Sequence, residues 1–226
     1  MISVIIPTLF KVDRLLQTLT ELSDCDEVGE IILIDNTDNL IPIILPKLKH
    51  ICEGRNTYVN PAWNKGVKLS SFDKLLILND DMWFDFSYLK DISVFITPSV
   101  GMIGMSSDMK EEFKIVPIET HFTDDLTHRP DGFGCCFFIH KSRYVPIPEE
   151  LKIWCGDDWL FYQDRNINYL IEGIKFDGHV SATFDDKNLK PHFDEVSSND
   201  ISVMRKLIKQ KKIVDFFAGS WWGKTE

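Results

Sequence analysis

The segment ISVIIPT, residues 2–8, is a short apolar run rich in β-branched side chains that stops at a proline and a threonine. Two later segments have the same form: IILID at residues 31–35 and LLILNDD at residues 75–81. Continuous apolar runs of this length, each followed by polar turn residues, predict strands that are buried on both faces. The three runs therefore indicate a sheet inside an α/β domain.

The segments between these runs predict helices. In residues 12–22 a valine and four leucines recur at helical spacing and give the segment one apolar face, and a shorter helix is predicted over Trp63–Leu69. Strands that alternate with helices favour a mostly parallel sheet, whose ligand crevice lies at the carboxyl ends of the strands. We therefore expect Thr8, Asp35 and the Asn79–Asp81 group to converge on one crevice.

The second half of the chain is less regular. The predicted elements are strands over Gly101–Met105, Gly134–Ile139 and Ile174–Thr183, a long polar loop over Ser106–Arg129, and a helix that follows Trp159 and runs through Tyr169. No linker or repeat divides the sequence, so we expect one mixed α/β domain over residues 1–226.

Charge and cysteine content exclude several classes of protein. The chain has 226 residues and a formal net charge of −10, so its field repels phosphate backbones and no nucleic-acid partner is expected. The 5 cysteines are odd in number and contain no CxxC pair, which is typical of reduced thiols in the cytoplasm. No apolar stretch approaches the roughly 20 residues that span a bilayer, and no signal peptide is recognisable. We therefore expect a soluble, cytoplasmic protein.

The Asn79-Asp80-Asp81 group places hard oxygen ligands at the end of a buried strand. Such a group can hold Mg²⁺ or Mn²⁺ against a diphosphate, because these cations are commonly bound by one or two carboxylates together with phosphate oxygens and water. The alternative is an ordinary turn or helix cap, where Asn and Asp are common for local reasons. The spacing alone leaves both interpretations open.

Four motifs together resemble the donor half of family 2 glycosyltransferases of the GT-A fold. They are Val4-Ile5-Ile6-Pro7-Thr8, Ile34-Asp35-Asn36, Asn64-Lys65-Gly66 and Leu78-Asn79-Asp80-Asp81. The resemblance implies a Rossmann-like GT-A fold with a mixed, mostly parallel central sheet, in which residues 1–100 form the donor half and 101–200 the acceptor half. Asn79 stands where a full DxD motif has its first aspartate, as in rhamnosyltransferase-like members.

The same resemblance implies a nucleotide-sugar donor, such as a UDP- or dTDP-sugar, and a Mn²⁺ or Mg²⁺ cofactor. By this resemblance Asp35 binds the nucleobase, Asp80 contacts the ribose or the metal shell, and Asp81 binds the metal. The full set of donor-binding residues that it implies is Pro7, Thr8, Asp35, Asn64, Asn79 and Asp80.

Gly156-Asp157-Asp158 is similar to the acceptor motif of that family, whose second acid is the general base of an inverting transfer. The resemblance gives this role to Asp158, with Asp157 beside it. The alternative for both acids is a solvated turn or a helix N-terminus. Trp154 and Trp159 flank the motif. They can form a flat apolar platform for a sugar ring, and the alternative is that they are ordinary core aromatic residues.

The late histidine that can complete the metal shell in this family corresponds to His179, with His192 as the second choice. The alternative is a structural histidine on the surface. The tail over Ile201–Phe217 alternates basic and apolar residues, and Trp221 and Trp222 follow it. We expect residues 201–226 to form an amphipathic helix and tail, which either contacts a membrane surface through residues 201–222 or covers the sheet.

The sequence therefore favours a metal-dependent, inverting glycosyltransferase that moves a hexosyl or deoxyhexosyl group to a hydroxyl of a glycan-type, lipid-linked or protein-linked acceptor. Two alternatives stay open. The first is a nucleotide-sugar-binding module without turnover, which stays open because Asn79 replaces the first aspartate of the DxD motif. The second is a sugar nucleotidyltransferase, although such enzymes carry a glycine-rich basic loop after the first strand and residues 9–14 contain no glycine. The sequence leaves the oligomeric state unknown.

Overall fold

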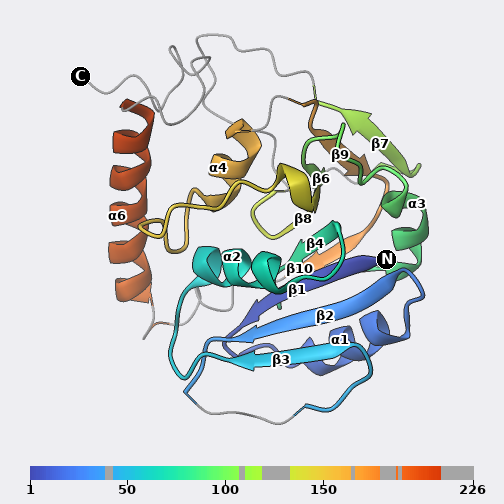
Figure 1. Ribbon diagram of the computed structural model, residues 1–226, viewed down its shortest axis with the longest axis horizontal. Coiled ribbons are helices and arrows are strands. Elements are labelled where there is room, and N and C mark those ends of the chain that lie inside the picture. The colour runs from blue at the N-terminus through green and yellow to red at the C-terminus, as the bar shows by residue number, and fades with distance from the viewer. Residues whose placement is uncertain are drawn as a thin grey trace.

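The computed structural model describes residues 1–38, 43–106, 110–118, 133–163, 166–178, 187 and 190–209. These residues form an eight-stranded sheet in the order β3-β2-β1-β4-β8-β6-β9-β7 and a separate two-stranded sheet, β10-β5 (Figure 1). The strands are β1 (Ile2–Thr8), β2 (Val28–Asp35), β3 (Leu48–Cys52), β4 (Lys74–Leu78), β5 (Met82–Phe84), β6 (Ile103–Met105), β7 (Lys114–Pro117), β8 (Cys136–His140), β9 (Tyr169–Glu172) and β10 (Phe176–Gly178).

Four neighbouring strands of the large sheet, β3, β2, β1 and β4, are parallel, and β1 lies in their middle. Ile5 of β1 pairs with Ile32 of β2 on one side and with Ile77 of β4 on the other. The strand β8 runs antiparallel to β4 and to β6, whereas β6 and β9 are parallel. The sheet is thus mixed and mostly parallel, as the sequence predicts, and its parallel part brings the ends of β1, β2 and β4 to one edge.

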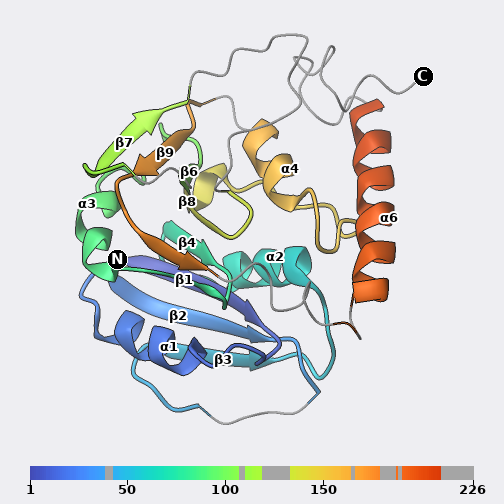
Figure 2. The ribbon, with the colours of Figure 1, turned by 180° about the vertical axis from the view of Figure 1, so that it is seen from behind.

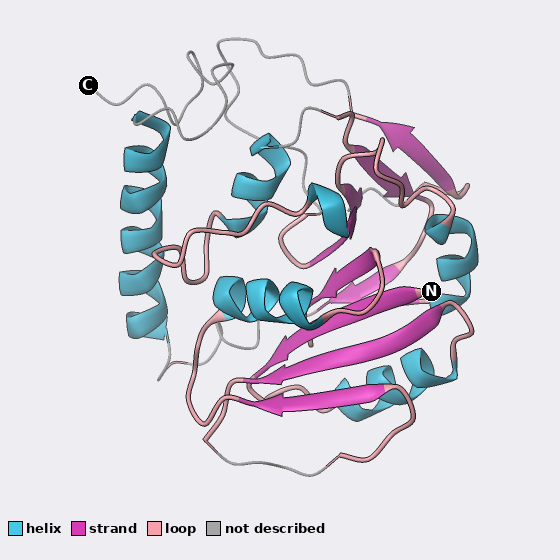
Figure 3. Ribbon diagram, in the orientation of Figure 1, coloured by secondary structure: helices cyan, strands magenta, loops and turns pink. Residues whose placement is uncertain are grey.

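Helices cover both faces of this sheet (Figures 2 and 3). They are α1 (Leu15–Asp24), α2 (Val59–Leu69), α3 (Leu89–Ser93), α4 (Gly156–Gln163) and α6 (Lys190–Lys209). Alternate side chains of a strand point to opposite faces, so Val4 and Ile6 pack with α1 and α3 while Ile5 packs with α2, α4 and α6. Each fully buried aliphatic side chain in these two cores contributes about 1.5 to 3 kcal/mol to stability.

The contact between α2 and β1 is unusually close at one point. A Cβ atom placed on Gly66 would lie 2.2 Å from Cγ2 of Ile5, so the helix can rest on the strand only because residue 66 has no side chain. The glycine of the Asn64-Lys65-Gly66 motif therefore has a packing role that fixes the distance of α2 from the sheet.

Several elements differ from the sequence predictions. The predicted loop over Ser106–Arg129 contains β7, an edge strand whose exposed and half-buried side chains lack the apolar run of a core strand. The helix predicted through Tyr169 ends at Gln163, and Tyr169 begins β9. The buried Asn168 side chain explains this break, because it accepts from the N–H of Met102 at 2.8 Å and donates to the C=O of Phe161.

The strands β3 and β5 are absent from the predictions, and the strand predicted over Ile174–Thr183 is described only as β10. The strand β3 is not predicted because its side chains are half-buried or exposed, so its sequence contains no continuous apolar run.

The C-terminal helix begins at Lys190, eleven residues before the predicted start. Its Met204 and Leu207 are buried in the core on the α2 side of the sheet, which is the arrangement expected of a helix that covers the sheet. Residues 210–226, with Trp221 and Trp222, lie outside the described part of the chain. Among the described helices, none combines the length and the hydropathy that crossing a membrane requires.

Candidate functional site

A cavity of about 430 Å³ lies at the carboxyl ends of β1 and β4 and reaches α4 and α6. Its lining includes seven residues that the sequence analysis proposed, namely Pro7, Thr8, Asn79, Asp80, Asp81, Trp154 and Asp157. The convergence predicted for the ends of the first and third strands is therefore present. Asp157 comes from the second half of the chain, so the cavity joins the two halves.

Thr8 and Asp80 connect the ends of β1 and β4 directly. The Thr8 hydroxyl donates to Oδ2 of Asp80 at 2.6 Å, and Oγ1 of Thr8 accepts from the backbone N–H of Phe10 at 2.8 Å. Phe10 has a φ of 54°, a left-handed conformation that bends the chain two residues after the strand, and Lys11 beyond it still lines the cavity. One threonine thus orients a carboxylate 72 residues away along the chain, in the turn between β4 and β5.

The environment of Asp80 disfavours its charged form. The pKa of the Asp80 carboxyl is raised to about 6: burial is the largest cause, the neighbouring charge of Asp81 adds to the rise, and the hydrogen bond from Thr8 opposes it. Two adjacent carboxyl groups in a cavity that each disfavour the charged form of the other are typical of a site that binds a cation.

The atoms around these acids fit a hard divalent cation. Asn79 donates its N–H to the C=O of Cys135 at 2.8 Å, and its buried Oδ1 has no hydrogen-bond partner among the described residues. With Asp80 and Asp81 it offers amide and carboxylate oxygens, the ligands that Mg²⁺ and Mn²⁺ prefer. Within the described ranges, no three Asp, Glu, His or Cys side chains gather as a ready metal cluster.

Asp35 is at the expected strand end but does not line the cavity. Its side chain is fully buried, and its carboxylate accepts from the N–H and hydroxyl of Thr37 at 2.9 and 2.7 Å and contacts Nε2 of His50 at 3.1 Å. The next residue, Asn36, lines the cavity instead, with Oδ1 held by the N–H and hydroxyl of Thr57. Asp35 therefore shapes the turn that presents Asn36.

Asn64 also lies away from the cavity. Its Oδ1 accepts from the Tyr144 hydroxyl and from the N–H of Ile147, both at 2.9 Å, and its amide donates to the C=O of Ile147 at 2.8 Å. The α2 face that carries Asn64 is turned to the segment after β8. The structure gives this side chain a positioning role between elements, and it does not line the cavity.

The two acids at the start of α4 lie in different environments. Asp157 is buried and lines the cavity, whereas Asp158 is half-buried and is not part of the lining. Both lie in the first turn of the helix, where the N–H groups and the helix dipole favour a carboxylate. Cys155, with a φ of 62°, produces the sharp turn that begins this helix.

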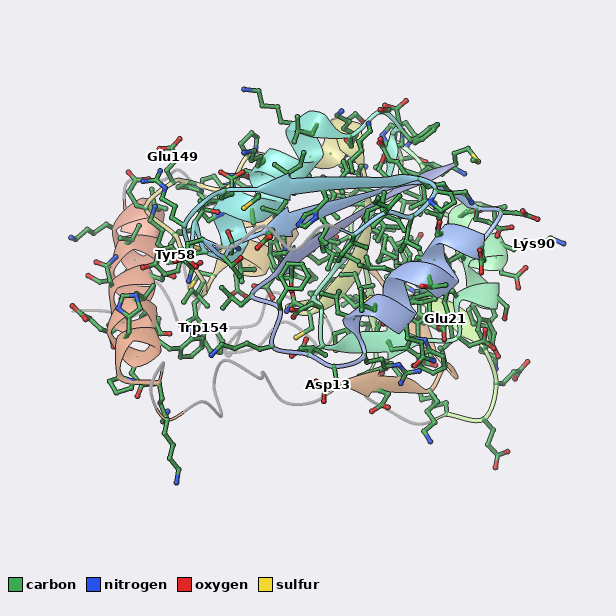
Figure 4. The ribbon with its side chains drawn as sticks, turned by 90° about the horizontal axis from the view of Figure 1, so that it is seen from below. Asp13, Glu21, Tyr58, Lys90, Glu149 and Trp154 are labelled. Carbon is green, nitrogen blue, oxygen red and sulfur yellow. The ribbon has the colours of Figure 1, made fainter. Side chains whose placement is uncertain are left out.

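The two tryptophans predicted as a platform also lie in different environments. Trp159 is buried in the core on the α2 side, as the core alternative predicts. Trp154 lines the cavity and keeps 47% of its surface exposed. Figure 4 shows Trp154 and Tyr58 beside α6, at the end of the molecule away from Glu21 and Lys90.

The two candidate histidines differ in what the structure says of them. His179 lies outside the described residues, and the strand before it ends with Gly178 paired to Met82, the residue after Asp81. His192 lies in α6, where Nε2 is 2.8 Å from the Tyr58 hydroxyl, and it does not line the cavity.

Lys11, Tyr58, Cys135 and Phe193 are among the lining residues that sequence reasoning did not single out. Lys11 comes three residues after the first predicted strand, and Cys135 lies at the start of the strand predicted over Gly134–Ile139, so attention to the strand ends could have found both. Tyr58 and Phe193 carry no local signal, because they reach the cavity only through the docking of α2 and α6.

Comparison with known proteins found no matching family model and no matching curated protein. Solved structures do match. S. aureus TarS residues 1–349 give a TM-score of 0.56 at 14% identity, over 96% of this chain and 74% of that chain. The chain spans only 43% of a longer TarS structure.

A TarS complex with UDP-GlcNAc matches with a TM-score of 0.53 at 14% identity, over 97% of this chain and 73% of that one. GalNAc-T7 with UDP, GalNAc and Mn²⁺ matches with a TM-score of 0.55 at 12% identity, over 96% of this chain and 56% of that one. These neighbours are glycosyltransferases of the GT-A type. At such low identity the likeness concerns the fold, and it shows that the chain adopts the GT-A fold.

Proposed function

We propose that this protein is a metal-dependent, inverting glycosyltransferase that uses a nucleotide-diphosphate sugar. One observation carries the proposal: a single cavity joins the acids at the end of β4 to the acid at the start of α4. Glycosyl transfer needs acidic groups on both sides of the anomeric carbon, one set for the cation that accompanies the diphosphate and another for the acceptor hydroxyl. The GT-A fold of the chain supports the same function.

On the donor side, we propose that Pro7, Thr8 and Asn36 border the nucleoside, with Asp35 holding the turn that presents Asn36. This differs from the direct nucleobase contact that the resemblance gives to Asp35, because the Asp35 carboxylate is already bonded to Thr37 and His50. UDP and dTDP sugars are the donors of choice, and TarS and GalNAc-T7 have both been solved with UDP.

Asp81 is the proposed principal metal ligand, with Asp80 and Asn79 beside it. A bound Mn²⁺ or Mg²⁺ would offset the charge that develops on the departing diphosphate. His179 is the proposed fourth contributor, which the pairing of Gly178 with Met82 next to Asp81 supports. We expect His179→Ala to weaken Mn²⁺ binding in the presence of nucleotide and the matched variant His192→Ala to leave it unchanged.

On the acceptor side, a carboxylate takes the proton of the acceptor hydroxyl as its oxygen forms a bond to the anomeric carbon. The bond between that carbon and the diphosphate oxygen breaks, its electron pair leaves with the nucleotide diphosphate, and the configuration inverts. The resemblance gives the role of base to Asp158. The lining of the cavity supports Asp157 for it, and the two assignments predict different mutants.

Release of free nucleotide from a panel of UDP-, dTDP- and GDP-sugars, with and without Mn²⁺, tests the function. We expect metal-dependent release from one donor, lost by about 100-fold or more in Asp81→Ala. Asp73→Ala, an exposed acid at the opposite end of β4, is the matched control and should behave as the wild type.

Calorimetry on the same samples covers a protein that turns over only with its acceptor present. Metal-linked binding of a nucleotide sugar without release by any acceptor would favour the binding-module alternative. Absence of any metal-linked nucleotide binding would contradict the proposed function.

A further inference from the structure

Three aromatic side chains form one wall of the cavity at its α6 end. They are Tyr58 at the start of α2, Trp154 before α4 and Phe193 in α6. The rings of Trp154 and Phe193 meet edge to face, with centroids 6.2 Å apart. Phe193 is buried by this contact, whereas nearly half of the Trp154 surface stays open. Asp80 and Asp81, which follow β4, line the same cavity.

The segment that carries Trp154 is held rigidly. The fully buried carboxylate of Asp200 accepts the N–H groups of Lys152, Ile153 and Trp154 at 2.7 to 3.1 Å. Asn60 holds the same segment from α2, because its amide donates to the C=O of Trp154 at 3.1 Å. A buried charge and a helix end thus fix the backbone beneath an indole that remains exposed.

Tyr58 is also fixed in an unusual conformation. Its φ of 69° lies in the left-handed region, where a side chain such as tyrosine is rarely found. The Oδ1 atom of Asn56 accepts its N–H at 2.8 Å, and its hydroxyl lies 2.8 Å from Nε2 of His192. Such strain at a cavity wall is typical of a functional site.

We propose that Tyr58, Trp154 and Phe193 form the subsite for a pyranose ring of the acceptor. The apolar face of the ring stacks on the exposed indole of Trp154, and one of its hydroxyls is directed to Asp157 in the same cavity. This inference rests on the proposed function, since it assigns that function an acceptor class.

The chemistry of the wall favours a carbohydrate. A pyranose has an apolar face of C–H groups and a rim of hydroxyls, and it needs an aromatic surface beside hydrogen-bonding groups. The wall offers the indole face together with the Asn56 amide and the Asp157 carboxylate as polar neighbours. The acids of the cavity disfavour an anionic acceptor at this position.

The test is a titration of the full chain with methyl pyranosides, followed by saturation-transfer NMR. The probes are methyl β-glucopyranoside, methyl β-galactopyranoside and methyl N-acetyl-β-glucosaminide, each with and without UDP and Mn²⁺. We expect saturable binding of at least one probe, strongest transfer to its ring C–H protons, and about tenfold weaker binding in Trp154→Ala.

Trp154→Phe, which keeps an aromatic face, should bind within about threefold of the wild type and guards against misfolding of the alanine variant. Phe95→Ala removes an exposed aromatic residue that does not line the cavity and should change nothing. Calorimetric binding of the nucleotide sugar should be equal in all these variants.

Absence of saturable pyranoside binding to a wild type that binds a nucleotide sugar would overturn the subsite, as would equal pyranoside binding in the wild type and a folded Trp154→Ala. Failure of the proposed function has a different signature, because nucleotide-sugar binding itself would then be missing from the wild type.

Discussion

The two sides of the cavity are constructed in different ways. The side proposed for the donor, here called the donor side, consists of strand ends: Thr8 and the Asn79–Asp81 group lie where β1 and β4 leave a sheet whose core side chains are fully buried. The side proposed for the acceptor, here called the acceptor side, consists of loop and helix starts that long-range polar contacts hold in place, above all the carboxylate of Asp200. On the first side the sheet supplies the position and short hydrogen bonds such as that from Thr8 to Asp80 orient the side chains, whereas on the second side hydrogen bonds hold the backbone itself.

The largest expected effect separates the acids of the acceptor side. We expect Asp157→Asn to lower glycosyl transfer by about 100-fold to 10,000-fold, because a general base that faces the cavity is lost, while donor binding is spared. Asp158→Asn is the matched control and should retain most of the activity. Steady-state transfer rates and calorimetry on both variants decide the point, and the reverse order of the two defects would assign the base to Asp158.

The next effect concerns the stability of the acceptor side. Asp200→Ala removes a buried acceptor from the N–H groups of three residues, and we expect it to lower the free energy of unfolding by about 3 kcal/mol. Asp194→Ala, which breaks an exposed ion pair with Lys190, should cost less than about 0.5 kcal/mol. Urea denaturation of both variants tests this, and equal losses would show that the loop is not held by Asp200.

A smaller effect of opposite sign is expected on the donor side. Because the folded state raises the pKa of Asp80 to about 6, the carboxylate destabilises the fold increasingly as the pH rises from about 4 to 6 and fully above that range. Without divalent metal, Asp80→Asn should therefore stabilise the protein by about 1 to 2 kcal/mol at pH 8 and by little at pH 4.

Thermal unfolding of Asp80→Asn in EDTA at the two pH values measures this gain. Addition of Mn²⁺ and nucleotide should reverse the order, because the wild type alone gains the full benefit of a bound cation. A variant that is less stable than the wild type at pH 8 in EDTA would contradict the electrostatic account of this side.

The last prediction concerns Cys135 and has the smallest expected effect on stability. Cys135 lines the cavity and is the one exposed thiol among the five cysteines. We expect N-ethylmaleimide to modify Cys135 first and bound nucleotide sugar to slow that reaction, whereas Cys135→Ser should change stability by less than about 0.5 kcal/mol. Mass spectrometry of the labelled peptides tests this, and labelling that nucleotide sugar leaves unchanged would separate Cys135 from the donor site.

The same contrast explains what the sequence could predict. The apolar runs that end at Thr8 and Asn79 are local signals, so the parallel sheet and the acids at its edge follow from short segments. The mixed, mostly parallel sheet and the GT-A fold are confirmed. The acids of the acceptor side are also local in sequence, but which of them faces the cavity depends on the turn at Cys155.

The remaining features depend on contacts that no short segment encodes. Whether Asp35 or Asn36 faces the cavity is set by Thr37, His50 and Thr57. The placement of Asn64 depends on the segment that returns after β8. Edge strands such as β3 and β7 lack the apolar pattern of core strands, so periodicity alone does not reveal them.

The contacts made by α6 also bear on the order of folding. The bonds of Asp200 span 46 to 48 residues, and the bond between Tyr58 and His192 spans 134. Contacts so distant along the chain require the closure of long loops and form late. During synthesis, which proceeds from the N-terminus, the strands of the donor side leave the ribosome well before Asp200. The nascent protein is therefore expected to pass through a state with an ordered donor edge and an unformed acceptor wall.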